Sequence, residues 1–325
     1  MKKHLYLAPM MKKTDRHFRF LVRLISPNTH LFTEMLPAEM IIRSMREKAL
    51  AFSDVEKPVA IQLGGSNPEI LAKATQISAN WGYGEINLNC GCPSKQVING
   101  NFGAYLMKDP KLAVSCVKAM RLAAPSSVSI SAKIRLGVDD LYSYDYLRDF
   151  VGKLKQAGAS IIHVHARKAM IKLSPKSNRA VPPINYLWVY KLKQDHADAV
   201  ITVNGEINTI SSAMKHLSAL DGIMIGRHAY SQPFDLINFD RSIFPESLAP
   251  KRNICEILEK YLRYTEIQLE AGVPIRKILQ PILNLYRDRP YAKLWRQLVT
   301  QQISSKNIDL QQLQAKASNL IVASL

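Results

Sequence analysis

One short stretch carries the residues best suited to chemistry, the run EINLNCGCPSKQV at residues 85–97. Ile86 and Leu88 alternate with polar residues and lead into an Asn-Cys-Gly-Cys-Pro-Ser loop, which predicts a short buried strand that ends in a tight turn. A thiol held at the end of a strand, in a chain with few cysteines, is a candidate for catalysis. We assign that role to Cys92 and expect Cys90 to pack beside the strand.

The elements that must position this loop are eight β-rich stretches that alternate with helix-length amphipathic runs. The predicted strands are residues 5–8, 31–33, 59–63, 85–89, 128–134, 161–165, 200–204 and 222–225. Helices are expected between them, among others at 68–81, 110–123, 144–158 and 209–217. Eight β-then-α units predict an α/β fold, a TIM (β/α)8 barrel, whose active site lies in the loops that follow the strands.

Polar and special residues do follow the predicted strands. They include Gln62, Lys133, His165, Asn204, Gly205, Gly226 and Arg227. In TIM barrels the loops after the seventh and eighth strands commonly hold a phosphate, which Arg227 and the backbone of the two glycines could contact. With Lys133 on the fifth strand and Gln62 on the third, this arrangement indicates flavin mononucleotide (FMN). Taken singly, Lys133 could pair with a carboxylate and His165 could be a core residue. The prediction of FMN therefore rests on the position of all these residues on one rim.

Beside a flavin, Cys92 would act on the opposite side of a planar substrate. A thiol with an ordinary pKa of about 8.5 is mostly protonated at neutral pH, so it suits a general acid that gives up one proton. A thiolate nucleophile would need a nearby histidine, and no histidine flanks this loop. The predicted reaction is therefore the addition of a hydride and a proton across a polarised double bond.

The charge of the chain points to a polyanion. Lys and Arg number 44 against 26 Asp and Glu, a net charge of +18, and a basic surface binds phosphates with release of counterions. Residues 165–179, HARKAMIKLSPKSNR, place many of these cations beside the predicted active site. They are expected around a nucleotide that is pulled out of folded RNA to reach a flavin. A merely basic protein with a solvated loop is the alternative.

The apolar runs and the cysteine content narrow the class of protein further. No run of 18 apolar residues occurs and the apolar stretch at the N-terminus is too short for a signal peptide, so a cytoplasmic protein with no membrane partner is expected. Four cysteines do not make a disulfide scaffold, and the Cys-Gly-Cys spacing is too short for a zinc pair, so no metal is expected.

A boundary is predicted at residues 245–253, PESLAPKRN, which are rich in proline and charge. Beyond it, apolar positions recur with a helical period at 254–271, 275–286, 291–304 and 308–325, which predicts a small all-α bundle. We therefore expect a catalytic barrel domain at residues 1–243 and a helical domain at residues 252–325.

Motifs along nearly the whole barrel resemble the tRNA-dihydrouridine synthases, and most closely their A-type branch. They are LAPM at 7–10, TDRHFR at 14–19, FTEM at 32–35, QLGGSNP at 62–68, EINLNCGCPS at 85–94, NGNFGAYLM at 99–107, KIRLGVDD at 133–140, HARKA at 165–169, LSPKSNR at 173–179, PPINY at 182–186, VNG at 203–205 and DGIMIGRHAY at 221–230. The resemblance implies FMN-dependent reduction of tRNA uridine to 5,6-dihydrouridine with NADPH as reductant. Flavin N5 would deliver hydride to C6, and Cys92 would protonate C5.

The resemblance also implies the residues of the site. FMN contacts would come from Pro9, Met10, Met11, Gln62, Lys133, His165, Asn204, Gly205, Glu206, Gly226 and Arg227. Contacts to tRNA would come from Asn89, Lys176 and Arg179 in the barrel and from Lys293 and Arg296 in the helical domain. The A-type branch implies D-loop uridines 20 and 20a as the target, and no obligate protein partner is evident.

The chain departs from the A-type pattern at a few positions. Lys12 and Lys13 stand where the A-type pattern has a Trp before the TDRH motif, and Glu206 makes NGE of the usual NGG. In the tail, Lys293 stands for an Arg, so it keeps attraction to a phosphate but loses the forked guanidinium. These changes spare the predicted flavin chemistry and affect the RNA-facing surface.

Two alternatives belong to other classes of function. An FMN barrel oxidoreductase that acts on a small molecule would turn over without RNA. A non-catalytic RNA-binding relic of the fold would have no use for Cys92, Lys133 and His165.

Overall fold

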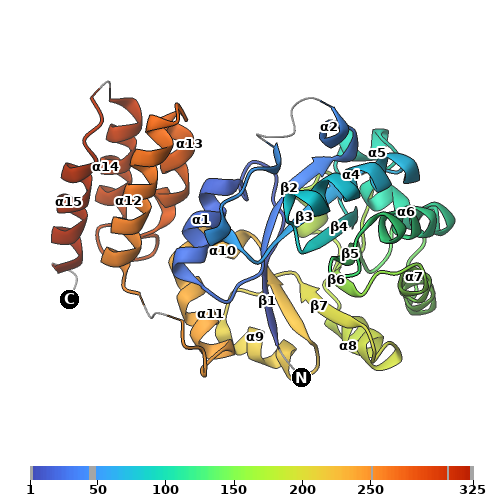
Figure 1. The fold of residues 1–325 in the computed structure, drawn as a ribbon. Helices are drawn as coiled ribbons and strands as arrows, with labels where there is room; N and C mark the ends of the chain where they lie inside the picture. The colour runs from blue at the N-terminus through green and yellow to red at the C-terminus, as the bar shows by residue number, and fades with distance from the viewer. Residues whose placement is uncertain (1–2, 44–48, 250–251, 306, 323–325) are drawn as a thin grey trace.

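The barrel is built from eight parallel strands in a computed structural model that describes residues 3–43, 49–249, 252–305 and 307–322 (Figure 1). The strands are β1 (His4–Leu7), β2 (Leu31–Pro37), β3 (Val59–Gly64), β4 (Glu85–Cys90), β5 (Ser129–Arg135), β6 (Ile161–His165), β7 (Val200–Asn204) and β8 (Gly222–Ile225). Their order is β1-β8-β7-β6-β5-β4-β3-β2, and a parallel bridge between Tyr6 and His30 joins the two ends. The predicted TIM barrel is confirmed.

Helices surround the strands where amphipathic runs predict them. They are α1 (Arg16–Ile25), α2 (Ala38–Ile42), α4 (Pro68–Trp81), α5 (Lys95–Asn99), α6 (Pro110–Ala123), α7 (Tyr144–Gln156), α8 (Tyr186–Asp195), α9 (Ile210–Leu217), α10 (Arg227–Ser231) and α11 (Leu236–Ile243). The side chains of Asn67 and Asp109 cap α4 and α6, each of which has a proline in its first turn. Both helices have the predicted bounds.

Two predicted elements differ from the structure by more than a shift of one or two residues at their ends. Strand β2 runs four residues past its predicted end at Thr33, because an irregularity in register lets Met35–Pro37 pair with β3. The predicted helix at 275–286 is split into α13 (Ile275–Leu279) and a 3₁₀ turn, Gln280–Asn284, because Pro281 lacks the N–H that an α-helix needs.

Alternation along the strands divides the barrel into two environments. In β4, Ile86, Leu88 and Cys90 are fully buried in the main hydrophobic cluster. Glu85 and Asn87, which alternate with them, form hydrogen bonds to Ser131 on the neighbouring strand. Because successive strand residues point to opposite faces, the apolar residues pack under the helices and the polar ones fill the barrel interior.

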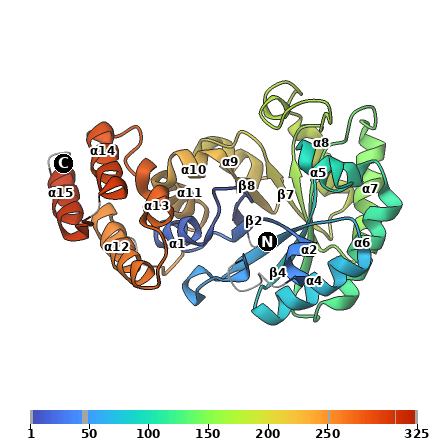
Figure 2. The ribbon, with the colours of Figure 1, turned by 90° about the horizontal axis from the view of Figure 1, so that it is seen from above.

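The C-terminal residues form a helical bundle beside α1 (Figures 1 and 2). Its helices are α12 (Ile254–Glu270), α13, α14 (Ala292–Ser304) and α15 (Leu310–Val322), and residues 323–325 of the last predicted helix lie outside the described residues. At the junction, Phe20 stacks on Tyr264 with ring centroids 3.9 Å apart, and Tyr264 hydrogen-bonds His17 Nδ1 at 2.7 Å. The division into domains at 1–243 and 252–325 stays a prediction. Within the described ranges no helix is both long and apolar enough to span a bilayer.

Candidate active site

The loop that carries Cys92 is held by its main chain on both sides. The backbone N–H groups of Gly91 and Cys92 donate to Asn89 Oδ1 at 3.1 and 2.9 Å, and the N–H of Ala104 donates to Cys92 O at 2.9 Å. A Cβ on Gly103, whose φ is +65°, would lie 2.6 Å from that carbonyl oxygen, so no larger residue fits there. The partly exposed Cys92 thiol, 3.5 Å from Ser94 Oγ, is therefore presented from a rigid support.

Cys90 differs from the partly exposed Cys92 in its burial. It is fully buried, and burial raises the pKa of its thiol above the ordinary value. Its position on the outer face of β4 agrees with the packing role that the sequence predicts.

Arg135 connects the Cys92 loop to the basic loop, and sequence reasoning assigned it no role. Its guanidinium donates to Gly91 O at 3.2 Å, to Lys168 O at 3.3 Å and to Asn178 O at 3.1 Å. Burial lowers the pKa of Arg135 to about 10, which still leaves it charged at neutral pH. Its place two residues after Lys133, on the same face of β5, is the signal that could have identified it.

Lys133 and His165 lie at the ends of neighbouring strands. Lys133 Nζ donates to Asn204 Oδ1 at 3.1 Å, and burial together with the charge of Arg135 lowers the pKa of Lys133 to about 7. Burial, with the surrounding cations, also lowers the pKa of His165 well below its ordinary value, so the imidazole is neutral. His165 Nδ1 is buried without a hydrogen-bond partner in the described part of the chain.

The glycines after β7 and β8 come close to these groups. A Cβ on Gly205, whose φ is +127°, would lie 3.7 Å from His165 Nε2 and 3.1 Å from a methyl group of Ile184. Gly226, after β8, approaches Met10 in the loop that follows β1. The VNG and IGR turns and the LAPM loop are thus neighbours around one rim.

Glu206 is exposed and has a left-handed backbone with φ of +52°, a conformation that glycine adopts more readily. Its carboxylate forms an ion pair with Arg167 Nη2 at 2.5 Å, and Arg167 also donates to Pro182 O. The negative charge that the NGE motif brings to the rim is therefore balanced within the chain. The sequence placed Arg167 among the basic residues expected around the RNA, whereas the structure engages its guanidinium with Glu206 and Pro182.

Three cations on the rim form no ion pair with a carboxylate of the described residues. Burial lowers the pKa of Lys13, and the charges of Arg179 and Arg227 lower it further, so the three side chains share one electrostatic environment. No ion pair of the described residues includes Lys13, Arg179 or Arg227, although Lys13 Nζ lies 4.5 Å from the centre of the Tyr230 ring. An anion would be attracted to this position.

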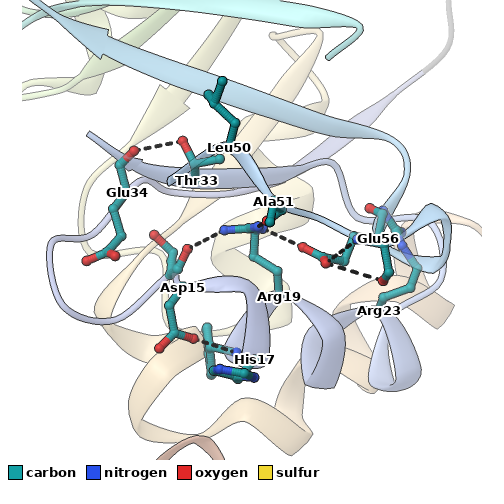
Figure 3. A network of polar contacts seen from close by, with 12 residues as sticks. Asp15, His17, Arg19, Arg23, Thr33, Glu34, Leu50, Ala51 and Glu56 are labelled. Carbon is teal, nitrogen blue, oxygen red and sulfur yellow. Dashed lines mark hydrogen bonds and ion pairs between the residues drawn. The ribbon is translucent and has the colours of Figure 1, made fainter. Parts of the chain in front are cut away.

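A buried ion pair supports the loop that contains Pro9, Met10 and the exposed Met11 (Figure 3). Arg19 Nε bonds Glu56 Oε2 at 2.7 Å, and Arg19 Nη1 donates to Thr14 O at 2.9 Å. Thr14 Oγ1 in turn accepts from the N–H of Met10 at 3.0 Å. The network therefore fixes the end of this loop through Thr14 and Met10.

The residues expected to contact RNA fall into three places. Asn89 is buried under the Cys92 loop, whereas Lys176 and Arg179 lie in the basic loop at the barrel mouth. Lys293 and Arg296 are exposed on α14 of the helical bundle, where they line a groove of about 840 Å³ together with Arg287. The structure thus brings the predicted flavin contacts onto one rim and places the last two RNA contacts apart from it.

The donor set of this rim suits a planar cofactor with a phosphate. Among the described residues, His165 offers an unpartnered buried nitrogen, and Lys133 and Arg227 supply positive charge without a carboxylate partner. Gly205 lies beside His165 without a side chain. Gln62, Asn204 and the LAPM loop add polar and apolar surface. These residues fit FMN. No group of three potential metal-ligating side chains occurs within the described ranges.

The sequence is similar to one family of known proteins. A family model described as dihydrouridine synthase matches residues 6–321. A protein of Xylella fastidiosa named tRNA-dihydrouridine(20/20a) synthase is 43% identical over 91% of this chain and 86% of its own length. Proteins of the same name from Synechocystis and Vibrio parahaemolyticus are 44% and 42% identical over 91% and 95% of this chain, and over 88% and 94% of their own lengths.

A solved structure shares the fold at low sequence identity. Morphinone reductase in complex with tetrahydroNAD superposes with a TM-score of 0.50 over 75% of this chain and 87% of its own, at 11% identity. At that identity the likeness concerns the barrel architecture alone.

Proposed function

The chain belongs to the dihydrouridine synthase family, and from that premise we propose that it is a flavin-dependent oxidoreductase that reduces uridines of tRNA to 5,6-dihydrouridine. The family match confirms the resemblance drawn from the motifs, and the relatives named above support tRNA as the substrate.

One observation carries the proposal: a partly exposed thiol stands on a rigid loop at the rim where the unbalanced cations gather. In tRNA, uracil is a planar ring joined through ribose to a phosphate backbone. Its reduction needs a proton donor beside the ring, and binding of the RNA needs cations around the phosphates. Cys92 fits the first requirement, and Lys13 and Arg179 fit the second, whereas the nearby Arg227 is assigned to the cofactor.

We assign cofactor binding to the rim residues that surround Lys133. FMN would be held by Pro9, Met10, Met11, Gln62, Lys133, His165, Asn204, Gly205, Glu206, Gly226 and Arg227. Bound there, the flavin supplies the hydride for C6 of the uracil, with NADPH as its reductant. Gly205 leaves room beside His165, and Lys133 offers a charge that favours an anionic group.

Cys92 then donates a proton to C5 as a general acid. The main-chain bonds to Asn89 and Ala104 hold the thiol in one place, which is what a proton donor requires. Arg135 fixes Gly91 relative to the basic loop, so the thiol and the RNA-binding loop keep one relative position.

We further propose how the RNA is held. Lys176 and Arg179 contact the strand around the target, and Asn89 acts at the base through the Cys92 loop that it holds. Lys293 and Arg296 of the helical domain contact a more distant part of the tRNA. The relatives' names support D-loop positions 20 and 20a as the targets. Because tRNA is the substrate, we place the enzyme in the cytoplasm.

The test is a reoxidation experiment. The FMN-loaded protein is reduced with NADPH under anaerobic conditions and then mixed with tRNA that lacks dihydrouridine. Rapid return of the oxidised flavin absorbance with that tRNA, and not with fully modified tRNA, is the expected result.

Other outcomes would contradict the proposal in different ways. A flavin that stays reduced with tRNA but is oxidised by small unsaturated molecules indicates the small-molecule oxidoreductase. A protein that takes up no FMN indicates the RNA-binding relic.

A further inference from the structure

A line of hydrogen bonds crosses the barrel interior below the rim. It begins at Thr202 Oγ1, which lies 2.7 Å from His163 Nδ1, and continues from His163 Nε2 to Glu85 Oε1 at 3.0 Å. From Glu85 it passes through Ser131, Asn87, Gln62 and Asn89 to the loop of Cys92. Glu85 and His163 are buried titratable residues to which the proposed chemistry gives no part.

Glu85 is the charged residue within this line. Burial opposes ionisation of Glu85, but hydrogen bonds from His163 and Ser131 outweigh it, so the pKa of the carboxyl lies below its ordinary value. His163 is enclosed by Tyr6 and Phe32, with ring centroids 4.7 and 5.3 Å away. An ionised carboxylate accepts hydrogen bonds and donates none.

That charge determines the direction of the bonds above it. The single hydroxyl proton of Ser131 must go to Glu85, at 2.6 Å, so Ser131 Oγ can only accept from Asn87 Nδ2, at 2.7 Å. Asn87 must then turn its Oδ1 toward Gln62 Nε2, at 2.8 Å. Every step has one allowed orientation.

The same logic reaches the active site. Since Gln62 donates to Asn87, its Oε1 faces Asn89 Nδ2, at 2.8 Å, and Asn89 Oδ1 is left to accept the N–H groups of Gly91 and Cys92. A reversed Asn89 amide would place its NH2 against those two N–H groups and lose both bonds. Gln62 keeps one further N–H, because its amide carries two and one goes to Asn87.

We propose that Glu85 is a positioning residue, which acts through Ser131 and Asn87 to fix the amide orientations of Gln62 and Asn89. Gln62 therefore presents an N–H donor, never a carbonyl, to a hydrogen-bond acceptor of the cofactor. Asn89 holds the Cys92 loop in the conformation that presents the thiol. This inference rests on the proposed function, because it takes Gln62 as a flavin contact.

The test breaks the line at Ser131 and compares it with a matched break on the far side of Glu85. Ser131→Ala removes the hydroxyl that transmits the orientation. Thr202→Val removes a buried hydroxyl of similar bond length that lies beyond His163 and off the path to Gln62. Three quantities are measured for each variant: the FMN dissociation constant, the midpoint potential of bound flavin, and the rate at which tRNA oxidises the reduced protein.

Ser131→Ala should weaken FMN binding and slow oxidation by tRNA by about tenfold each, as the loss of oriented hydrogen bonds implies, and should shift the potential. Thr202→Val should leave all three quantities near the wild-type values, although the thermal stability of both variants should fall. Ser131→Thr, which keeps the hydroxyl, should restore the wild-type behaviour. Equal effects of Ser131→Ala and Thr202→Val would reduce the line to a structural role and overturn the proposal.

A second variant covers the case in which Ser131→Ala does not fold. Glu85→Gln keeps the size of the side chain but no longer compels Ser131 to donate, so it should shift the same quantities in the same direction. Wild-type values from a folded Glu85→Gln protein contradict the inference. If the wild-type protein itself binds no FMN, the proposed function fails first, and the two failures are thereby distinguished.

Discussion

The barrel rim and the helical tail both carry cations, but the two regions hold them differently. On the rim, Arg135 donates to three carbonyl oxygens and Lys133 to Asn204, so these side chains have defined positions. On α14, Lys293 and Arg296 are exposed, and no hydrogen bond or ion pair of the described residues involves them. The rim therefore holds Lys133 and Arg135 in defined positions, whereas the tail cations supply positive charge without a fixed position.

This difference indicates a division of work. Chemistry on a small ring needs groups placed within a few tenths of an ångström, which buried hydrogen bonds provide. Attraction to a phosphate backbone needs only positive charge at moderate distance. Substitutions on the rim should therefore change rates, and substitutions on the tail should change affinity and its dependence on salt.

The largest effect is expected at the thiol. Cys92→Ala should lower dihydrouridine formation by roughly 10²- to 10⁴-fold, the usual contribution of a general acid, and should leave FMN binding and reduction by NADPH unchanged. Nucleoside analysis of tRNA after incubation measures the product. Cys90→Ala is the control, since it removes a buried thiol from the end of β4, two residues before Cys92, and should lower stability without a comparable loss of rate. An unchanged product yield from Cys92→Ala would exclude the proton-donor role.

The next effect separates the two regions directly. Lys176→Ala with Arg179→Ala should weaken tRNA binding on the order of tenfold at moderate salt and lower the rate at saturating tRNA. Lys293→Ala with Arg296→Ala should weaken binding similarly but leave that rate unchanged. In both pairs the slope of log affinity against log salt should fall by about 1.5.

Exposed lysines on α6 provide the control for both pairs. Lys111→Ala with Lys118→Ala removes two charges from the outer wall of the barrel and should leave affinity and slope near the wild-type values. A rate loss from the tail pair equal to that from the rim pair would show that the two regions do not differ as described.

A smaller effect concerns pH. The pKa of Lys133 is lowered to about 7, and its protonated form favours an anionic cofactor, so FMN affinity should fall as pH rises from about 7 to 9. The fall can reach at most tenfold per pH unit, and the phosphate, with a pKa near 6, is already ionised in this range. Titration of flavin fluorescence at several pH values measures it. Lys133→Met should bind more weakly and show no such trend; a persistent trend would assign it to another group.

The smallest effect is expected from Lys293→Arg, which restores the residue of the A-type pattern. A forked guanidinium can bond a phosphate through two N–H groups, so tRNA should bind about two- to threefold more tightly. The salt slope should stay the same because the charge does not change. A weaker complex would indicate that this surface does not contact phosphate in the proposed way.

The period of the apolar residues was enough to predict the barrel. Alternation along β4 predicted the strand, because a strand directs successive residues to opposite faces whatever lies beside it. The Asn-Cys-Gly-Cys-Pro-Ser composition predicted the turn after it, and the catalytic role of Cys92 stays a prediction. Caps such as Asn67 and Asp109 are likewise local, which is why α4 and α6 have their predicted bounds. The polar residues after the strands were expected to meet on one rim because the carboxyl ends of parallel strands do so.

The sequence by itself thus determined the elements, their order and the residues that face the rim. Only the tertiary structure decided that Arg135 reaches carbonyls of residues 44, 33 and 43 positions away, and that His163 meets a glutamate 78 positions before it. Local propensity and periodicity carry no information on such pairs, because these contacts depend on the register between strands and on the closure of the barrel. The orientation of Gln62 and Asn89, which those contacts set, is a property of the folded barrel.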